Sequence, residues 1–338
     1  MWYTVRHMAK KRYLTGDRPT GPLHLGHYFG SLKNRIQFQE EGKEGFIIIA
    51  DFQVVTDRLE TDAIEQNIIE LTKDYLAAGI DPQKTTIFVQ SHIHEISVLT
   101  MLFSMIVTVP QLERNPTIKE EAKAMGQNDK MSLGMLSYPV SQAADILLFQ
   151  PGIIPVGVDQ APHIELTRDI AARFNRLYGE TFVIPEMVLS PQSRLLGLDG
   201  TQKMSKSRGN AIFLKDSEEE IFEKVKKATT DSEAKIYFDE EKRPAVSNLL
   251  LLFSLTSGRT VESIVEEFGN SGNKVFKEAL SESINNFLSP MRARREQLDE
   301  EYVKNVIREG TKRAQAVAHE TLTQVREHMR FAYPSIFN

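Results

Sequence analysis

Residues 13–27 read YLTGDRPTGPLHLGH: a short apolar run, a turn rich in glycine and proline, and the first turn of an amphipathic segment. Apolar residues then recur at helical spacing from Tyr28 to Ile36. We therefore expect a strand at 13–15 that runs through the turn into a helix. A strand, a turn and a helix in this order are typical of parallel α/β sheets.

The same alternation continues toward residue 180. Strands are predicted at 46–50, 85–89 and 153–156, where apolar and β-branched residues run together. Helices are predicted between and after them, at 64–75, at 98–107 and at 164–174. The fold class is therefore α/β with a parallel sheet, in which ligands bind beyond the carboxyl ends of the strands.

Beyond residue 208 the strand signal fades, and helical segments are predicted at 217–230, 244–256, 260–268, 274–288, 290–309 and 311–330. A chain of 338 residues accommodates about two domains. We divide it into an α/β domain at 9–207, with a helical insertion at about 110–150, and an all-helical domain at 208–338. Residues 1–8 are interpreted as an irregular extension.

The composition excludes several classes of protein. The sequence contains no cysteine, which excludes disulfides, thiolate catalysis and cysteine-ligated metals, and which fits a reducing compartment. With 41 basic and 46 acidic residues, any nucleic acid would bind a local patch rather than a generally basic surface. No apolar run is long enough to cross a bilayer. We expect a cytoplasmic protein with no membrane partner.

A first motif, HLGH at 24–27, lies where the first predicted helix begins. Helix N-termini bind phosphates through their free N–H groups and the positive end of the helix dipole. Gly26 leaves room for a base or ribose, and His24 and His27 can donate hydrogen bonds to a phosphate. The alternative is a turn with two exposed histidines, but the position after a strand favours a nucleotide site.

A second motif, KMSKS at 203–207, lies between Gly200 and Gly209. Its two lysines can fold onto a polyphosphate and stabilise the negative charge that develops on a leaving pyrophosphate. The alternative is a solvated basic linker between domains. The presence of both motifs favours nucleotide chemistry.

The two motifs together resemble the paired signatures of the class I aminoacyl-tRNA synthetases, and within that class those of the bacterial tryptophanyl-tRNA synthetases. The resemblance runs in order from about residue 12 to 256 and includes TGDRPTG at 15–21, YPVSQAADI at 138–146, PVGVDQ at 155–160, HIELTRD at 163–169, TDS at 230–232 and SNLL at 247–250. It implies a Rossmann-type catalytic domain, a helical anticodon-binding domain and a homodimer. The implied activity is that of a tryptophan–tRNA ligase, which uses ATP and Mg²⁺ to join tryptophan to the 3′ end of tRNA(Trp).

The resemblance also implies which residues form the site. Those implied in catalysis are His24, His27, Lys203 and Lys206. Those implied to bind ATP are Arg18, Pro19, Thr20, Gly26, His27, Gly157, Val158, Asp159, Leu195, Lys203, Met204, Ser205, Lys206 and Ser207. Those implied to bind tryptophan are Tyr138, Gln142, Asp145 and Gln160. No residue is assigned as a metal ligand, and Mg²⁺ is expected to bridge phosphate oxygens.

Tryptophan and tyrosine enzymes of this class share the fold, and Asp145 bears on the choice between them. Its carboxylate lies in the apolar run AADILL at 143–148, where an unpaired charge is costly. In the tryptophan enzymes the matching carboxylate is implied to accept the indole N–H, and it would reject side chains without that donor. The alternative is a helix-cap or core-paired aspartate. Gln142 and Gln53 depart from the family pattern, and Gln142 would contact either the indole or Asp145.

Other interpretations stay open at this point. A small-molecule nucleotidylyltransferase can carry the first motif, and a non-catalytic paralogue can bind tryptophan or RNA without charging tRNA. Lys119 and Lys123 would belong to a lid over the phosphates or to a solvated helix. The basic clusters are candidates for tRNA phosphate contacts or ordinary solvated helix faces: Lys224, Lys226 and Lys227; Arg292, Arg294 and Arg295; Lys312 and Arg313.

Overall fold

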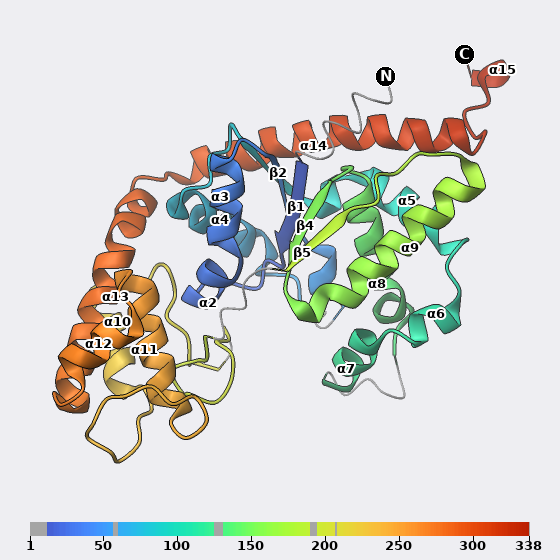
Figure 1. Cartoon of the computed structure of the whole chain (residues 1–338). Coiled ribbons are helices and arrows are strands. Elements are labelled where there is room, and N and C mark those ends of the chain that lie inside the picture. Colours follow the sequence, from blue (N-terminus) through green and yellow to red (C-terminus); the bar gives the residue numbers. More distant parts are fainter. Residues whose placement is uncertain (1–11, 57–59, 125–130, 190–194, 207, 338) are drawn as a thin grey trace.

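The structure is a computed structural model, and it describes residues 12–56, 60–124, 131–189, 195–206 and 208–337. Its centre is a parallel sheet in the strand order β3-β2-β1-β4-β5 (Figure 1). The strands are β1 (Arg12–Asp17), β2 (Glu44–Ile49), β3 (Thr85–Val89), β4 (Ile153–Val156) and β5 (Glu186–Leu189). The order reverses between β1 and β4, and doubly wound sheets bind ligands at such a switch point.

The predicted α/β fold and the first four strands are confirmed. β2 and β3 are buried along nearly their whole length, as their unbroken apolar sequence requires. β5 was not predicted. Most of its residues are exposed at the edge of the sheet, so it carries no long apolar run to mark it.

Helices cover both faces of the sheet (Figure 1). Ile47 of β2 packs on the side of α4, whereas Phe46 packs on the opposite side with α5, α8 and α9, because successive strand residues point to opposite faces. The α-helices of this half are α2 (Leu25–His27), α3 (Lys33–Glu40), α4 (Ile64–Ala78), α5 (His94–Ser104), α6 (Val109–Glu113), α7 (Pro116–Ala124), α8 (Leu133–Leu147) and α9 (Ala161–Tyr178). Shorter helical turns are η1 (Tyr28–Leu32), η2 (Phe52–Val54), η3 (Gln90–His92) and η4 (Val158–Gln160).

The C-terminal part is helical, as predicted. It comprises α10 (Glu218–Lys227), α11 (Pro244–Ser257), α12 (Val261–Phe268), α13 (Gly272–Glu296), α14 (Glu300–His328) and α15 (Pro334–Phe337). One apolar core runs without interruption from Leu25 and Phe29 into α11 and α13. The division of the chain at residue 208 therefore stays a prediction, because the core continues across it.

The predicted bounds of the last long helices are wrong. We expected breaks at 289 and 310, whereas α13 continues through Pro290 and α14 through Gly310. Burial of Leu288 and Met291 on either side of Pro290 holds α13 together despite the hydrogen bond that proline cannot make. The break lies before Glu300, where the Asp299 side chain caps the first turn of α14.

α14 runs from the helical part along the sheet to the far side of the α/β part (Figure 1). Val303 packs in the same core as α13, and Ala318 packs in the core of α5, α8 and α9. Gly310 lies where the helix passes β3: a Cβ there would lie 1.9 Å from the carbonyl oxygen of Ile87. The glycine thus permits close approach of two backbones rather than ending the helix.

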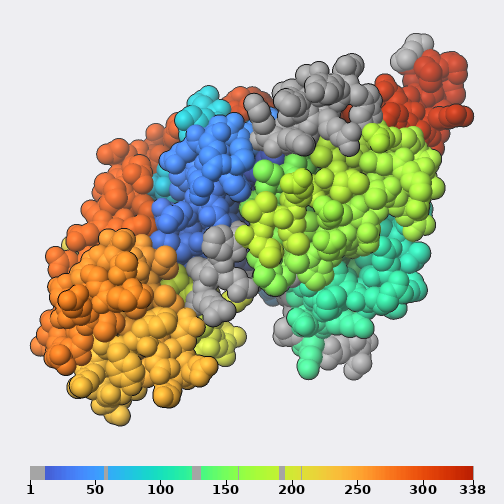
Figure 2. All heavy atoms as spheres, in the orientation of Figure 1, coloured from blue at the N-terminus to red at the C-terminus, as the bar shows by residue number. Residues whose placement is uncertain are grey.

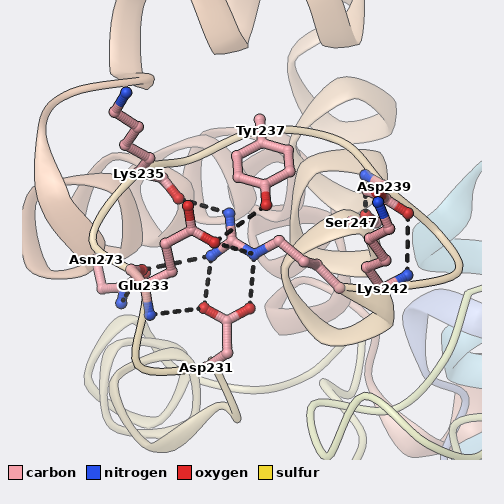
Figure 3. A network of polar contacts seen from close by, with 9 residues as sticks. Asp231, Glu233, Lys235, Tyr237, Asp239, Lys242, Ser247 and Asn273 are labelled. Carbon is pink, nitrogen blue, oxygen red and sulfur yellow. Dashed lines mark hydrogen bonds and ion pairs between the residues drawn. The ribbon is translucent and has the colours of Figure 1, made fainter.

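The loop between α10 and α11 is ordered by a polar network around Arg243. This nearly buried guanidinium donates to both oxygens of Asp231, at 2.7 and 2.6 Å, and to the carbonyl of Lys235. It also lies 4.3 Å from the centre of the Tyr237 ring. Figure 3 shows Asp231 and Tyr237 on opposite sides of this network. The Arg243 hydrogen bonds hold the pKa of Asp231 below its usual range.

No helix in the described part of the chain combines the length and the apolar character needed to cross a membrane.

Candidate functional site

A cavity of about 410 Å³ opens at the carboxyl ends of β1 and β4, the edge at which the sequence placed ligands. Its walls come from β1 and the turn after it, from η1, from α8 and from β4 with η4. In the space-filling view the surface is hollowed between the C-terminal helices and the region of α6 and α7 (Figure 2). One end of the cavity carries residues of both motifs, and the other carries Asp145.

The first motif forms the turn that enters α2. The backbone N–H of His24 donates to Nδ1 of His27 at 3.3 Å, so the proton of His27 is on Nε2. Burial lowers the pKa of His24 to about 3 and that of His27 to about 4, with the charge of Lys206 acting in the same direction. Both imidazoles are therefore neutral at pH 7, so His27, which lines the cavity, can offer a phosphate an N–H but no charge.

His24 and His27 do not occupy equivalent positions. His27 lines the cavity, whereas His24 is almost fully buried with its ring 3.8 Å from that of His27. Nδ1 of His24 has no hydrogen-bond partner among the described residues. A Cβ on Gly26 would lie 2.9 Å from this atom, so Gly26 makes room for His24.

A buried ion pair fixes the end of β1 beside the cavity. Asp17 accepts from Nη1 of Arg35 at 2.7 Å and from the hydroxyl of Tyr75 at 2.6 Å. Burial alone would raise the pKa of Asp17, but the Arg35 guanidinium holds that pKa well below its usual range. This carboxylate therefore keeps its charge and its partners across the physiological pH range.

The second motif closes over the first through Lys206. Its Nζ donates to the carbonyl of Gly21 at 2.7 Å and to the hydroxyl of Thr20 at 3.3 Å. Lys206 lines the cavity. Lys203 is exposed, and its backbone forms an isolated antiparallel β-bridge with Leu196. The two lysines thus differ: Lys206 lies at the turn that precedes the first motif, and Lys203 lies outside the lining.

The loop of the second motif is built around Asn210, a buried residue. Its Oδ1 accepts from the backbone of Ser205 at 2.9 Å, and its Nδ2 donates to Asp199 at 2.8 Å and to the carbonyl of Lys203 at 3.3 Å. Buried Asn248 of α11 holds the preceding segment by accepting from the backbone of Leu196. The helical part therefore supports this loop directly.

At the other end, Asp145 of α8 is buried and faces the cavity. Both of its carboxylate oxygens accept from Nε2 of Gln90, at 2.9 and 2.8 Å. Burial raises the pKa of Asp145 to about 7, with the Gln90 hydrogen bonds opposing and the charge of Asp51 adding to the rise. Each carboxylate oxygen keeps a further lone pair, with which it can accept a hydrogen bond from a ligand in the cavity.

Glutamine amides line the wall beside Asp145. Gln53, Gln142 and Gln160 all contribute to the lining, and Nε2 of Gln142 lies 3.5 Å from Oε1 of Gln160. The sequence analysis considered two contacts for Gln142, with the indole or with Asp145. In the structure its amide pairs with Gln160 instead of Asp145, and it lies on the cavity wall. This end of the cavity therefore offers amide groups as well as a carboxylate to a bound side chain.

Comparisons with known proteins agree with this geometry. The family described as tRNA synthetases class I (W and Y) matches residues 7–289. The chain belongs to this family. The tryptophan–tRNA ligase of Treponema pallidum is 44% identical over 94% of this chain and 96% of its own length. The crystal structure of tryptophanyl-tRNA synthetase from Mycoplasma pneumoniae has a TM-score of 0.82 at 33% identity and covers 96% of this chain and 99% of its own.

A third comparison includes bound ligands. The structure of tryptophanyl-tRNA synthetase from Campylobacter jejuni complexed with ADP and tryptophan has a TM-score of 0.82 at 31% identity, over 94% of this chain and 99% of its own. The matches to these three proteins each extend over nearly the whole of this synthetase. The family resemblance inferred from the motifs is confirmed.

The cavity of this synthetase brings together many of the residues predicted from the sequence. Those in its lining are Arg18, Thr20, His27, Gln142, Asp145, Gly157, Gln160 and Lys206. Pro19, Gly26, Leu195, Met204 and Ser205 lie in the supporting turns, and Val158 is half-exposed on η4. Ser207, the side chain of Asp159 and residues 1–8 lie outside the described part of the structure.

Tyr138 of the synthetase is not among the residues of this lining. Its hydroxyl lies 2.7 Å from Oε2 of Glu121 and 2.7 Å from Nε2 of His163. Burial and the bond to Glu121 raise the pKa of Tyr138 above its usual range. In this conformation Tyr138 ties α8 to α7 and α9, and its implied contact with tryptophan stays a prediction.

Two supporting residues of the synthetase escaped the sequence analysis. Gln90 directly follows β3, and the rule that carboxyl ends of strands line the site would have drawn attention to it. Asn210 follows Gly209 just beyond the second motif, and no local pattern marks it. Gln90 acts on Asp145, which is distant in the sequence, and Asn210 acts on residues of its own loop. A single sequence does not reveal such hydrogen bonds.

Proposed function

We propose that this synthetase is a tryptophan–tRNA ligase that activates tryptophan with ATP and transfers it to tRNA(Trp). The observation that carries the proposal is the buried carboxylate of Asp145 in the wall of the same cavity that receives Lys206 and His27. A buried carboxylate favours a side chain with an N–H donor, because a ligand without one adds nothing to the Gln90 hydrogen bonds that offset the burial of its charge. The relatives named above carry the same activity in their names.

The first step joins the amino acid to the nucleotide. A carboxylate oxygen of tryptophan forms a bond to the α-phosphorus of ATP, the bond from that phosphorus to the bridging oxygen breaks, and pyrophosphate leaves. The tryptophan carboxylate is already ionised at pH 7, so the step requires no general base. Alignment and charge stabilisation are what the protein supplies.

The residues of the two motifs divide this work. Nε2–H of His27 donates to the phosphates, and Gly26 keeps the turn compact. Lys206 exchanges its bond to the Gly21 carbonyl for the developing charge of pyrophosphate. Lys203 joins it from the exposed side of the loop, while Gly157 and Asp159 are assigned to the ribose.

Mg²⁺ fits this site as a companion of the nucleotide. The described residues contain no group of three or more histidine or acidic side chains placed to hold a metal ion. Mg²⁺ in such sites is commonly held by phosphate oxygens and water with few protein ligands. Bound in this way it would neutralise charge on the phosphates of ATP.

The second step transfers the tryptophanyl group to the 3′ end of tRNA. We assign residues 208–338 to an anticodon-binding domain and place the enzyme in the cytoplasm, where a cysteine-free chain meets a reducing medium. Lys226 and Lys227 of α10 and Lys312 of α14 are exposed and pair only with glutamates of their own helices, so they are the candidates for RNA contacts, whereas Arg292 and Arg295 pair with other elements.

A homodimer is the assembly we propose. Large apolar side chains are exposed along α5, α6 and the start of α8, and they are Val98, Met101, Met105, Val109 and Leu133. An apolar surface of this kind is typical of a protein interface. We expect Met105→Glu to shift the mass measured by sedimentation from dimer to monomer, and Val275→Glu, at an exposed apolar position on α13, to leave it unchanged.

The activity is tested by tryptophan-dependent exchange of pyrophosphate into ATP, followed by charging of tRNA. Exchange with tryptophan but not with tyrosine or without amino acid supports the proposal. Exchange with tyrosine alone would make the chain a tyrosine enzyme. Tryptophan binding without exchange would indicate a regulatory paralogue, and nucleotidyl transfer to another acceptor would indicate a nucleotidylyltransferase.

A further inference from the structure

The last turn of α13 carries arginines whose partners lie on α4, in the other part of the chain. Nε of Arg295 donates to Oδ1 of Asp74 at 3.0 Å, and its Nη2 lies 2.6 Å from Oε2 of Glu70. Nε of the neighbouring Arg294 donates to the carbonyl of Ala77 at 2.6 Å. The two arginines thus contact the same helix, but only Arg295 meets a buried carboxylate.

Asp74 joins this contact to the first motif. Its side chain is fully buried, and its second oxygen, Oδ2, accepts from the backbone N–H of Leu23 at 2.7 Å. We call residues 18–23, which join β1 to the first motif, the nucleotide turn. Leu23 directly precedes His24, so this hydrogen bond holds the backbone where the nucleotide turn enters α2. A buried carboxylate is tolerated here because it has both a backbone donor and a guanidinium.

The adjacent residue of α4 holds the other end of the same turn. The hydroxyl of Tyr75 donates to Asp17 at the end of β1. Successive residues of α4 therefore fix residue 17, where the turn leaves the sheet, and residue 23, where it enters the helix. The intervening residues include Arg18, Thr20 and Gly21, the last two in contact with Lys206.

We propose that Asp74 is a positioning residue for the nucleotide turn, and that Arg295 of α13 holds it in place from the helical part of the chain. The inference rests on the proposed function, because it assumes that the turn binds ATP. Its physical basis is that transfer reactions are sensitive to displacements of about 1 Å, which cost on the order of a hundredfold in rate.

The experiment compares Arg295→Met with the matched control Arg294→Met. Both remove one charge from the same helical turn and keep an apolar stem, but only the first leaves Asp74 without its guanidinium. For Arg295→Met we expect the Kd for ATP to rise and kcat of the exchange to fall, each on the order of tenfold. The Kd for tryptophan should stay within about twofold, because Asp145 lies at the other end of the cavity.

Arg294→Met should lower the melting temperature less than Arg295→Met, because it leaves no buried carboxylate without its guanidinium, and it should leave both nucleotide parameters within about twofold. Arg295→Lys, which keeps the charge, should recover part of the loss. Asp74→Asn keeps an oxygen for Leu23 but loses the charge, and combining it with Arg295→Met should cost little beyond the worse single change, since the two act as a unit.

Equal kinetic effects of Arg295→Met and Arg294→Met, or a loss confined to melting temperature, would overturn the inference. ATP affinity, measured by titration calorimetry, separates it from the proposed function. A wild-type protein that binds ATP but shows no tryptophan-dependent exchange refutes the function, while the affinity ratio between the two variants still decides the role of Asp74. A wild-type protein that binds no ATP overturns both.

Discussion

The two ends of the cavity are built on different physical plans. The end that we propose for the phosphates, the phosphate end, consists of two short loop motifs with neutral histidines and a lysine that has a polar partner on the turn. The end that we propose for the amino acid, the tryptophan end, consists of a buried carboxylate and glutamines contributed by separate elements. Binding and rate should therefore separate: changes at the first end alter the nucleotide and the chemical step, and changes at the second alter the choice of amino acid.

The largest separation is expected from Gly26→Val at the phosphate end. Its Cβ would lie 2.9 Å from Nδ1 of His24 and its methyls would displace the turn, so ATP use should be abolished. Tryptophan affinity, measured by titration without nucleotide, should remain near wild type in a folded protein. Normal ATP affinity in this variant would break the assignment of the turn.

Lys206→Ala should lower kcat of pyrophosphate exchange on the order of a hundredfold, because the lysine charge acts mainly on the leaving pyrophosphate. Tryptophan affinity should be unaffected. Lys203→Ala should have the same sign and a smaller effect, since Lys203 lies outside the cavity lining. The control is Arg208→Ala, at an exposed position of the same loop. If this variant loses as much kcat as Lys206→Ala, the effect comes from the overall positive charge of the loop and not from Lys206 itself.

These comparisons also show what the sequence could predict and what it could not. The residues proposed for the phosphate end could be predicted because strand, turn and helix are contiguous and the motif residues are neighbours in the chain. The residues proposed for the tryptophan end could be predicted only in part: Asp145 was marked by a charge in an apolar run, but Gln90 is 55 residues away and meets it only after the sheet forms. The pairing of Gln142 with Gln160 could not be predicted either, because it joins α8 to η4 across the fold.

The same contrast between local patterns and distant contacts applies to the fold. β1 to β4 and α4 were marked by local patterns, whereas β5 is a short exposed edge and carries none. Gly310 was misinterpreted because its reason, the approach of α14 to β3, is a contact across the fold. The Arg292, Arg294 and Arg295 cluster resembled an RNA-binding patch in the sequence, but the structure engages it with α4 and α10.

Asp145→Ala tests the tryptophan end. Loss of a charge-assisted hydrogen bond costs roughly 1.5–3 kcal/mol, and tryptophan binding should weaken accordingly. Discrimination against phenylalanine should fall in the same variant, because the penalty for an unpaired acceptor disappears. ATP affinity is the control and should not change. A lower melting temperature with unchanged selectivity would make Asp145 a core residue and reopen the tyrosine alternative.

The smallest effect is a pH dependence confined to this end. Because burial raises the pKa of Asp145 to about 7, its carboxylate gains a proton as the pH falls below 7, and the charged acceptor for the indole N–H is lost. Tryptophan affinity should therefore fall between pH 8 and pH 6, by a few-fold. Asp145→Asn should abolish this dependence, and a slope retained in that variant would assign it to another group.

The most direct test of the two-ended cavity is a pair of calorimetric titrations, of tryptophan and of ATP, into Asp145→Asn and Gly26→Val. The account predicts a crossed result: Asp145→Asn weakens tryptophan binding and keeps ATP affinity, while Gly26→Val loses ATP and keeps tryptophan. Parallel loss of both ligands in either folded variant would contradict it, because it would show that the two ends do not act separately.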